Sequence, residues 1–500
     1  MGPNTAMASS MQAHKLLCFS LLLFHLLSLP LLASAAGRKL SAKPGYQTLY
    51  IDPALRAKMR AGLLAETKVS IPADGLLATE IVDRNRLPSS ARVNPTSTSE
   101  DAFTEAFSQR LVRDSARVKG IEERLEVARM GANTAEWKPA NVDGLSQEEI
   151  SSPLVSGLSQ GSGEYFARFG VGTPPKESYF VIDTGSDLSW TQCAPCNSCY
   201  KQTDPIFNPA DSSSYKPVSC SDALCSQLLV RGCQRNQCLY QVSYGDGSFT
   251  VGDFAVETFT FSGNQVERVA LGCGHDNEGL FIGASGLLGL GAGRLSLPTQ
   301  LKQEFSYCLP DRFGRGSSQL IFGRGAAPGG STFTPLLKNA RLGTFYYVQL
   351  EGISVGGSRL RIASSAFALQ SSGTGGVILD SGTSITRLVA SAYSALRDSF
   401  AAGASNLPSA GSFSLFDTCY ALGGMSSVDV PTVELHLAGG TTLSLPAENY
   451  LIPVDTAGTY CFGFAGTNSG FSIIGNMQQQ GYRISFNLAT SRVGFASNQC

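Results

Sequence analysis

A short motif occurs twice in the chain, and this repeat constrains the fold more than any other feature of the sequence. Residues 181–186 read Val-Ile-Asp-Thr-Gly-Ser, and residues 378–383 read Ile-Leu-Asp-Ser-Gly-Thr. Each copy is typical of an apolar strand that ends in a turn started by aspartate. A Leu-Leu-Gly segment ends 106 residues after the first aspartate, and an Ile-Ile-Gly segment ends 95 residues after the second. The repeat therefore predicts two similar halves, related by a pseudo-two-fold axis that brings the two aspartates face to face.

The two aspartates, Asp183 and Asp380, are the candidate catalytic residues. Carboxylates held about 3 Å apart cannot both ionise, so they share one proton and titrate in two separate steps. The ionised carboxylate can then deprotonate a water molecule, while the protonated one donates to a carbonyl oxygen and stabilises the developing oxyanion. The pair therefore predicts hydrolysis of an amide bond in mildly acidic medium.

Six residues that follow the two aspartates are expected to support them: Thr184, Gly185, Ser186, Ser381, Gly382 and Thr383. The hydroxyl group directly after each aspartate can bond to the backbone of the opposite loop. The hydroxyl group three residues after each aspartate can bond to the outer carboxylate oxygen. The glycine between them allows the backbone to approach the carboxylate.

Residues 239–250 predict a hairpin between the two motifs, because apolar and polar residues alternate on either side of a Gly-Asp-Gly-Ser tip. Such a hairpin can close over a bound peptide and exclude water. We expect Tyr244 and Gly245 to form this flap, with the indole N–H of Trp190 donating to the Tyr244 hydroxyl group.

The first 36 residues predict a secretory signal peptide. Lys15 precedes an apolar stretch, and small residues end the segment at Ala36. The mature protein is therefore expected in the secretory pathway, with the apoplast as destination and the vacuole or another organelle as alternatives. Since no other segment reaches about 18 continuous apolar residues, no membrane anchor is expected.

Residues 37–156 differ in composition from the rest of the chain. They hold 17 basic and 16 acidic residues in 120 positions, whereas residues 157–500 hold 20 and 23 in 344, so the first segment is far more charged. Apolar residues recur there at helical spacing: Phe103, Phe107, Leu111, Val118, Ile121 and Leu125. We interpret the segment as a helical pro-segment that is removed; a disordered linker is the alternative.

Short apolar or alternating runs separated by Gly, Pro, Ser and Asn fill the remainder, which predicts an all-β fold. The repeat divides it into an N-terminal catalytic lobe at residues 157–342, with a cysteine-rich insert at 193–238, and a C-terminal catalytic lobe at residues 343–500. The chain has 13 cysteines; Cys18 leaves with the signal peptide. Twelve cysteines in an exported protein predict six disulfides.

Charge and motif counts argue against other classes of protein. Lys and Arg total 38 against 39 Asp and Glu, so no nucleic acid partner is expected. The Cys-x-x-Cys-x-x-Cys run that begins at Cys193 lacks the fourth ligand of an iron–sulfur site, and no metal or other cofactor is expected. Ser354 lies in a Gly-x-Ser-x-Gly pattern with His436 downstream, but strand and turn rather than a helix are predicted around this serine, which argues against a serine hydrolase.

From about Gly163 to Cys500 the chain resembles the pepsin-like aspartic peptidases, in particular the plant nepenthesin-type group. The resemblance rests on the two Asp motifs, Trp190, the Tyr-Gly-Asp-Gly-Ser segment at 244–248 and the two apolar-apolar-Gly segments. It implies a bilobal double β-barrel with the active-site cleft between the lobes. It also implies a monomeric, acid-active aspartic endopeptidase that cleaves proteins or peptides and is blocked by pepstatin-like inhibitors.

The same resemblance implies six disulfide pairings: Cys193–Cys196, Cys199–Cys273, Cys220–Cys238, Cys225–Cys233, Cys308–Cys500 and Cys419–Cys461. The alternative function is that of a non-catalytic inhibitor or binding protein with the same fold, similar to the plant xylanase inhibitors. Such proteins typically have a damaged Asp motif or flap, whereas both motifs and Tyr244 are intact in this chain.

Overall fold

A computed structural model of the chain describes residues 43–51, 77–83, 99–129, 165–244, 248–279, 281, 283–301, 304–309, 319–323, 326–497 and 499. All of them belong to one compact unit, residues 40–500. The predicted signal peptide and its cleavage site lie outside the described residues, as does Gly245 of the predicted flap. Among the helices of the described part, none is both long enough and apolar enough to cross a membrane.

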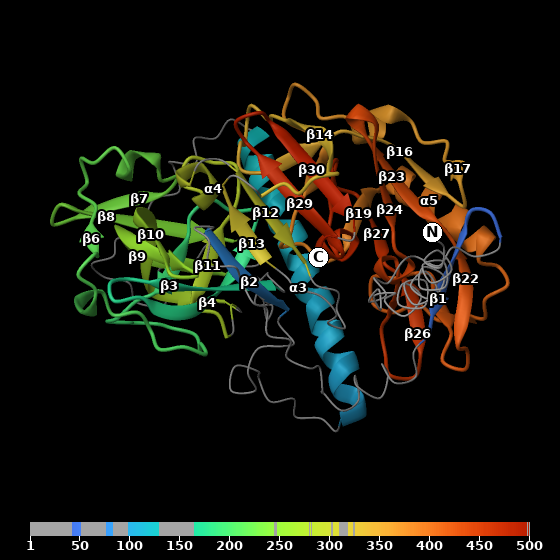
Figure 1. Cartoon of the computed structure of the whole chain (residues 1–500), viewed down its shortest axis with the longest axis horizontal. Helices are drawn as coiled ribbons and strands as arrows, with labels where there is room; N and C mark the ends of the chain where they lie inside the picture. The colour runs from blue at the N-terminus through green and yellow to red at the C-terminus, as the bar shows by residue number, and fades with distance from the viewer. Residues whose placement is uncertain are drawn as a thin grey trace, which may run out of the picture. The chain divides into compact units, whose positions relative to one another are not determined.

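The strand that carries the first aspartate is β4 (Lys176–Asp183). Its last four residues are buried, because it lies between antiparallel β3 and parallel β11, where Asp183 is opposite Gly289. The other strands of this half extend the same sheet (Figure 1): β3 (Tyr165–Val171), β5 (Trp190–Gln192), β6 (Lys216–Pro217), β7 (Arg231–Gln234), β8 (Gln237–Ser243), β9 (Phe249–Phe261), β10 (Asn264–Glu278) and β11 (Gly286–Gly289).

The second half repeats this arrangement. Here β18 (Val377–Leu379) ends directly before Asp380 and runs parallel to β28 (Ser472–Ile474), with Leu379 opposite Ile474. Both apolar-apolar-Gly segments are therefore the parallel neighbours of the Asp strands, and the predicted two similar halves are confirmed. Strands β15 (Tyr346–Val348), β19 (Thr386–Val389) and β27 (Phe464–Thr467) complete this sheet.

Two four-stranded sheets and a helix surround it. The first sheet has the order β17-β16-β23-β24 and the second β20-β21-β26-β25. Helix α5 (Ala390–Gly403) packs on β19 and β27. The strands are β16 (Leu350–Val355), β17 (Ser358–Arg359), β20 (Ser409–Ala410), β21 (Cys419–Ala421), β23 (Val433–Leu437), β24 (Thr441–Leu445), β25 (Leu451–Pro453) and β26 (Thr459–Phe462); the short helices α4 (Leu297–Gln300) and α6 (Asn476–Gln479) complete the set.

A central sheet joins the two halves. The pairings give the strand order β2-β13-β12-β29-β30-β14. Its strands come from both halves and from the N-terminal segment: β2 (Leu77–Asp83), β12 (Glu304–Cys308), β13 (Gln319–Phe322), β14 (Thr332–Leu337), β29 (Tyr482–Asn487) and β30 (Arg492–Ser497). The fold is thus mostly β with two lobes, and the all-β prediction is correct for the strands but omits α5.

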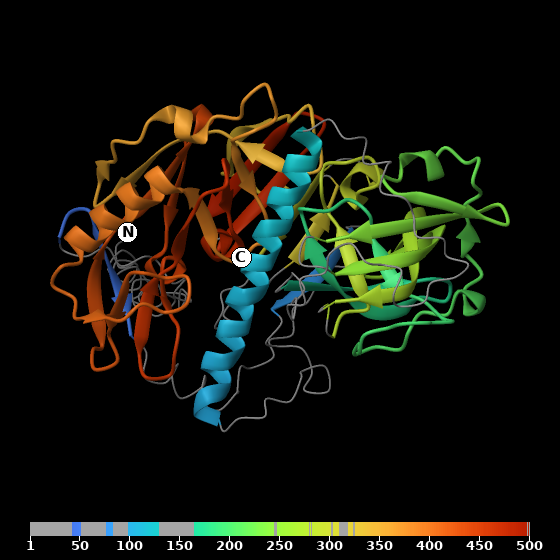
Figure 2. The ribbon, with the colours of Figure 1, turned by 180° about the vertical axis from the view of Figure 1, so that it is seen from behind.

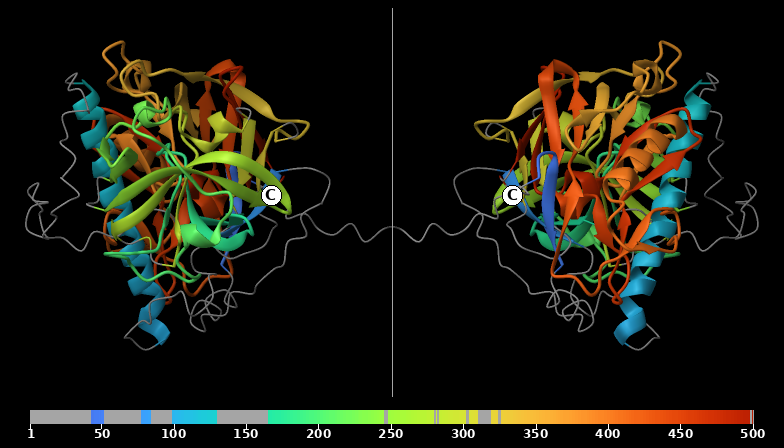
Figure 3. Two further views of the ribbon diagram at one scale, coloured as in Figure 1. Left: turned by 90° about the vertical axis from the view of Figure 1, so that its left-hand side faces the viewer. Right: turned by 90° about the vertical axis from the view of Figure 1, so that its right-hand side faces the viewer.

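The N-terminal segment contains one long helix, α3 (Ser99–Arg129), as its periodicity predicts. Phe107, Leu111, Val118 and Ile121 are buried on one face of α3, which lies between the two halves (Figure 2). The segment also contributes β2 and β1 (Tyr46–Tyr50), which pairs with β22 (Ser427–Pro431). In both views of Figure 3, α3 lies on one side of the strands and the blue strands β1 and β2 lie on the other.

Two pairings predicted for the first four cysteines, Cys193–Cys196 and Cys199–Cys273, are wrong. The structure has Cys193–Cys273 and Cys196–Cys199. The reason is strand register: β5 runs parallel to β10, and the N–H of Cys193 donates to Gly274 O at 2.8 Å, so Cys193 lies beside Cys273.

The predicted pairings Cys220–Cys238 and Cys225–Cys233 are also wrong, since the bridges are Cys220–Cys233 and Cys225–Cys238. Hairpin β7–β8 places Cys233 and Cys238 opposite each other, but only Cys238 is buried. Cys225 lies in the same apolar cluster as Cys238 and pairs with it, whereas Cys220 lies near the surface and pairs with the exposed Cys233. The Cys419–Cys461 pairing is confirmed. Cys308 is disulfide-bonded, and the predicted pairing with Cys500 lies outside the described residues.

Candidate active site

The two aspartates lie together in the interior. Asp183, the last residue of β4, is 1% exposed, and Asp380, the residue directly after β18, is 0% exposed. Reciprocal bonds join their loops: the N–H of Ser381 donates to Thr184 Oγ1 at 2.8 Å, and the N–H of Thr184 donates to Ser381 Oγ at 3.3 Å. These bonds agree with the expected role of the first hydroxyl residue after each aspartate.

Each carboxylate is held by the residues that follow it. Ser186 Oγ donates to Asp183 Oδ2 at 2.7 Å, and Thr383 Oγ1 donates to Asp380 Oδ2 at 2.6 Å. The backbone N–H groups two residues after each aspartate donate to the Oδ1 atoms, at 2.9 Å for Gly185 and 3.1 Å for Gly382. Both carboxylates are therefore fixed in orientation, with their Oδ1 atoms available to a group between them.

An arginine from α3 occupies that position. Arg117 Nη2 donates to Asp183 Oδ1 at 2.5 Å and to Asp380 Oδ1 at 2.9 Å, while its Nε donates to Asp380 Oδ2 at 2.9 Å. Burial raises the pKa of Asp380, but the charge of Arg117 and hydrogen bonds from Arg117 and Thr383 outweigh it, so the pKa is lowered. A Cβ atom at Gly185 would lie 2.5 Å from Arg117 Nη2, so the glycine makes room for this contact.

Two other charged residues of α3 bind the same two loops. Asp114, 3% exposed, accepts from the backbone N–H groups of Ser384 and Ile385 and forms an ion pair with Arg387. Arg124 Nη1 donates to Gly185 O at 2.9 Å. The helix is therefore attached to the candidate catalytic loops of both halves.

The charged face of α3 is the part of the site that sequence reasoning missed. Arg110, Asp114, Arg117 and Arg124 follow one another at intervals of four, three and seven residues, which places them on one helix face. This face adjoins the apolar stripe that the periodicity identified. Charged residues next to the buried apolar stripe of an amphipathic helix are the signal that could have predicted polar contacts between α3 and the rest of the protein.

The predicted hairpin is formed by β8 and β9. The indole N–H of Trp190 donates to the Tyr244 hydroxyl group at 2.7 Å, as expected. Phe281 packs edge-on against both rings, with centroid distances of 5.0 Å to Trp190 and 5.4 Å to Tyr244. The aromatic cluster therefore holds the hairpin close to its tip, where the N–H of Tyr244 donates to Ser248 O at 2.8 Å.

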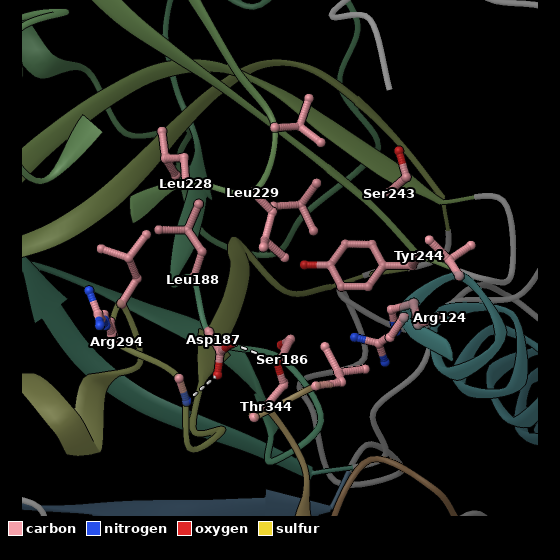
Figure 4. A pocket seen from close by; sticks show the side chains of 18 of the residues that line it. Arg124, Ser186, Asp187, Leu188, Leu228, Leu229, Ser243, Tyr244, Arg294 and Thr344 are labelled. Carbon is pink, nitrogen blue, oxygen red and sulfur yellow. Dashed lines mark hydrogen bonds between the residues drawn. The ribbon is translucent and has the colours of Figure 1, made fainter. Parts of the chain in front are cut away.

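A pocket of about 690 Å³ adjoins the first aspartate loop (Figure 4). Its lining includes the apolar side chains of Leu188, Leu228, Leu229 and Val242, the Tyr244 ring and, from α3, Arg124. At its floor Asp187 accepts from Thr344 Oγ1 and from the N–H of Gly293, both at 2.8 Å. Burial raises the pKa of Asp187. The pocket is suited to an apolar side chain.

The structure also brings together the two residues of the rejected serine hydrolase motif. Ser354 Oγ lies 2.7 Å from His436 Nε2, but Ser354 lies inside strand β16, and the other imidazole nitrogen contacts Thr442 Oγ1. No carboxylate hydrogen-bonds to His436 among the described residues, so the third member of a triad is missing there. Within the same part of the chain, no group of three or more His, Cys, Asp or Glu side chains is arranged to hold a metal ion.

A two-lobed, mostly β fold with a pair of interlocked Asp-(Thr/Ser)-Gly-(Ser/Thr) loops defines the pepsin-like aspartic proteases. Two family models match the chain: Xylanase inhibitor N-terminal over residues 165–324 and Xylanase inhibitor C-terminal over residues 345–497. Aspartyl protease family protein 2 of Arabidopsis thaliana is 57% identical over 405 residues, which cover 79% of this chain and 81% of that protein. Aspartic proteinase nepenthesin-1 of Nepenthes gracilis is 40% identical, over 78% of this chain and 92% of that protein.

The chain therefore belongs to the plant pepsin-like aspartic proteases, and by this homology it is an aspartic-type endopeptidase. Basic 7S globulin from soybean has the same fold, with a TM-score of 0.53 and 22% identity over 68% of this chain and 93% of that chain. At this level of identity the likeness concerns the fold alone.

Proposed function

We propose that the chain is the precursor of a secreted aspartic endopeptidase that hydrolyses peptide bonds at acidic pH, with Asp183 and Asp380 as the catalytic residues. In this proposal residues 1–36 are the signal peptide, residues 37–156 are the pro-segment, and residues 157–342 and 343–500 are the two catalytic lobes. The lobes form a double β-barrel with the active-site cleft between them. The apoplast is the proposed destination.

One observation supports the chemistry above all others. A single atom, Arg117 Nη2, is within hydrogen-bonding distance of one oxygen of each catalytic carboxylate. After the pro-segment has left, a water molecule at the same position could form hydrogen bonds to both carboxylates. The ionised carboxylate takes a proton from this water as it attacks the peptide carbonyl carbon, and the protonated carboxylate donates to the carbonyl oxygen. Collapse of the tetrahedral intermediate, with a proton passed to the leaving nitrogen, completes the hydrolysis.

In the precursor, Arg117 excludes that water and α3 excludes the substrate. Arginine remains charged at all pH values relevant to proteins, so the bridge cannot be released by deprotonation of Arg117. We propose that activation instead requires displacement of α3, followed by cleavage of the pro-segment. The substrates are proteins or peptides with a bulky apolar residue beside the cleaved bond, because leucine, valine and tyrosine side chains contribute to the lining of the pocket next to the first aspartate loop.

The test uses the full-length chain produced in a secretory host and incubated at pH 3 to 5, a window chosen because a carboxylate pair holds one proton there. We expect cleavage of a denatured protein that pepstatin blocks and that Asp183→Asn lowers by a factor of about 10³ or more. The matched control is Asp398→Asn, which removes an exposed carboxylate on α5 that pairs with Arg397. A processed, folded wild type that binds pepstatin without turnover would instead support the inhibitor-like alternative.

A further inference from the structure

We propose that the cleft wall formed by Ser384, Ile385 and Arg387 is a substrate subsite that binds the side-chain carboxylate of an aspartate or glutamate in the peptide. The inference rests on the proposed function, in which α3 leaves and a peptide takes its place. It adds a specificity determinant for an acidic residue at some distance from the cleaved bond.

The subsite is already occupied in the precursor by a carboxylate from α3. Asp114 Oδ1 accepts from the backbone N–H of Ser384 and, at 3.1 Å, from that of Ile385. Asp114 Oδ2 accepts from Arg387 Nη2 at 2.7 Å. All three donors belong to residues 384–387 of the second half, so they stay in place when the helix departs. Three donors converge on this carboxylate, and Asp114 stands in for the substrate group. Burial raises the pKa of Asp114 in the docked state, and the part of that burial that α3 supplies ends when the helix departs.

The charge of Arg387 favours a negatively charged substrate group over a neutral one in the place that Asp114 leaves. Arg387 is 5% exposed, and within the described ranges its one ion-pair partner is Asp114. Its Nη1 atom is buried and has no hydrogen-bond partner among the described residues, so the guanidinium has donor capacity beyond what Asp114 uses. Arg110, the other cation that faces Asp114, leaves with α3. When α3 departs, Arg387 loses Asp114 as its counter-ion, and a substrate carboxylate supplies a new one through a charge-assisted hydrogen bond.

The position of the subsite follows from helix geometry. Asp114 precedes Arg117 by three residues, which corresponds to about 4.5 Å along the helix axis. Arg117 marks the catalytic centre, and an extended peptide advances about 3.3 Å per residue. The acidic residue therefore binds within about three residues of the cleaved bond, on one side of it.

The experiment uses the processed wild-type enzyme and a set of amidated, fluorescence-quenched peptides that share one neutral, apolar cleavage site. A single aspartate is moved through three positions on each side of that site, and each peptide has an asparagine twin. At one position we expect kcat/KM at pH 5.5 to be about tenfold higher or more for aspartate than for asparagine, as for a charge-assisted bond. The ratio should approach one at pH 3, where a carboxyl with an ordinary pKa of about 3.9 is mostly protonated.

Variants assign the preference to the proposed residue. Arg387→Gln should bring the aspartate-to-asparagine ratio at pH 5.5 close to one, and Arg387→Lys should keep part of it. The control Arg397→Gln removes a partly exposed arginine that pairs with Asp398 and Asp417 and should leave the ratio unchanged. Equal cleavage of every aspartate and asparagine twin by the wild type would overturn the inference, as would a preference that survives Arg387→Gln. In both cases, cleavage of the neutral peptides shows that the proteolytic function stands, whereas the absence of any cleavage refutes that function itself.

Discussion

The Nη2 atom of Arg117 lies 2.5 Å from Oδ1 of Asp183, and both side chains are almost completely buried. A residue of the N-terminal segment thus forms an ion pair with the first candidate catalytic carboxylate, across 66 positions of sequence. The apolar face of α3 and its buried charges contact both halves, so the side chain that bridges the two aspartates also helps to dock the helix.

Replacement of Arg117 should weaken the latency of the precursor. In Arg117→Gln the buried carboxylates lose their cation, and breaking a buried ion pair in this way costs about 3–5 kcal/mol. We expect self-processing at pH 5 to be about 100-fold faster or more than in the wild type. The measurement is the half-time for loss of the precursor band. Lys119→Gln is the control, because Lys119 lies on the exposed face of α3; an equal acceleration in this variant would show that helix stability and not the bridge sets the rate.

Acidification should release α3 from the catalytic loops. The pKa of Asp380 is lowered in the docked state, because the charge of Arg117 and its hydrogen bonds outweigh burial. A carboxyl group with a lowered pKa stabilises the docked state above its ordinary pKa, about 3.9, and this contribution is lost as the pH falls through the lowered value. We expect amide hydrogen exchange in residues 99–129 to accelerate below about pH 4 after correction for intrinsic rates.

The contribution of Asp114 to the docking of α3 changes with pH in the direction opposite to that of Asp380. Burial raises its pKa despite Arg387 and the two backbone donors, so its contribution to docking is complete below the ordinary pKa and is lost as the pH rises through the raised value. Acid release is therefore assigned to Asp380. Protection of residues 99–129 that stays constant from pH 6 to pH 3 would contradict this assignment.

The hydrogen bond between Trp190 and Tyr244 should matter for turnover. Tyr244→Phe leaves the buried indole N–H without its acceptor, which costs about 1–3 kcal/mol, so kcat/KM of the processed enzyme should fall about tenfold. Trp190→Phe should lower kcat/KM by a similar factor. The kcat/KM of the double variant should be close to that of the less active single variant, because both replacements remove the same hydrogen bond. Tyr200→Phe is the matched control, because the Tyr200 hydroxyl is buried near Trp190 without a hydrogen-bond partner among the described residues. A fully additive double variant would show that the two residues act separately.

The disulfide topology predicts unequal losses of stability. The Cys193–Cys273 bridge spans 80 residues and the Cys196–Cys199 bridge spans 3. By loop-closure entropy, double serine replacement should lower the free energy of unfolding by about 4.5 kcal/mol for the long loop and about 1.6 kcal/mol for the short one. Urea unfolding measures both values. Peptide mapping under non-reducing conditions tests the topology directly, since a peptide that joins Cys199 to Cys273 would contradict it.

Much of the site could be read from residue patterns. The two Asp motifs, their hydroxyl supports and the flap tyrosine are local features, each defined within a few residues by strand and turn chemistry. The repeated apolar-apolar-Gly segments predicted two similar halves, and in the structure β11 and β28 are the parallel neighbours of the two Asp strands. Helix α3 was likewise predictable, because its apolar residues recur at helical spacing over several turns.

The sequence by itself therefore determined the paired aspartates, the strand-rich halves and the long helix, because hydrogen bonding and side-chain periodicity within short segments specify these features. Only the tertiary structure decided which residue lies between the aspartates, which cysteines pair and that β1 adds to β22 some 380 residues away in the chain. These contacts join segments far apart in sequence. Their partners depend on strand register and on which faces are buried once the chain has folded, and no local pattern contains that information.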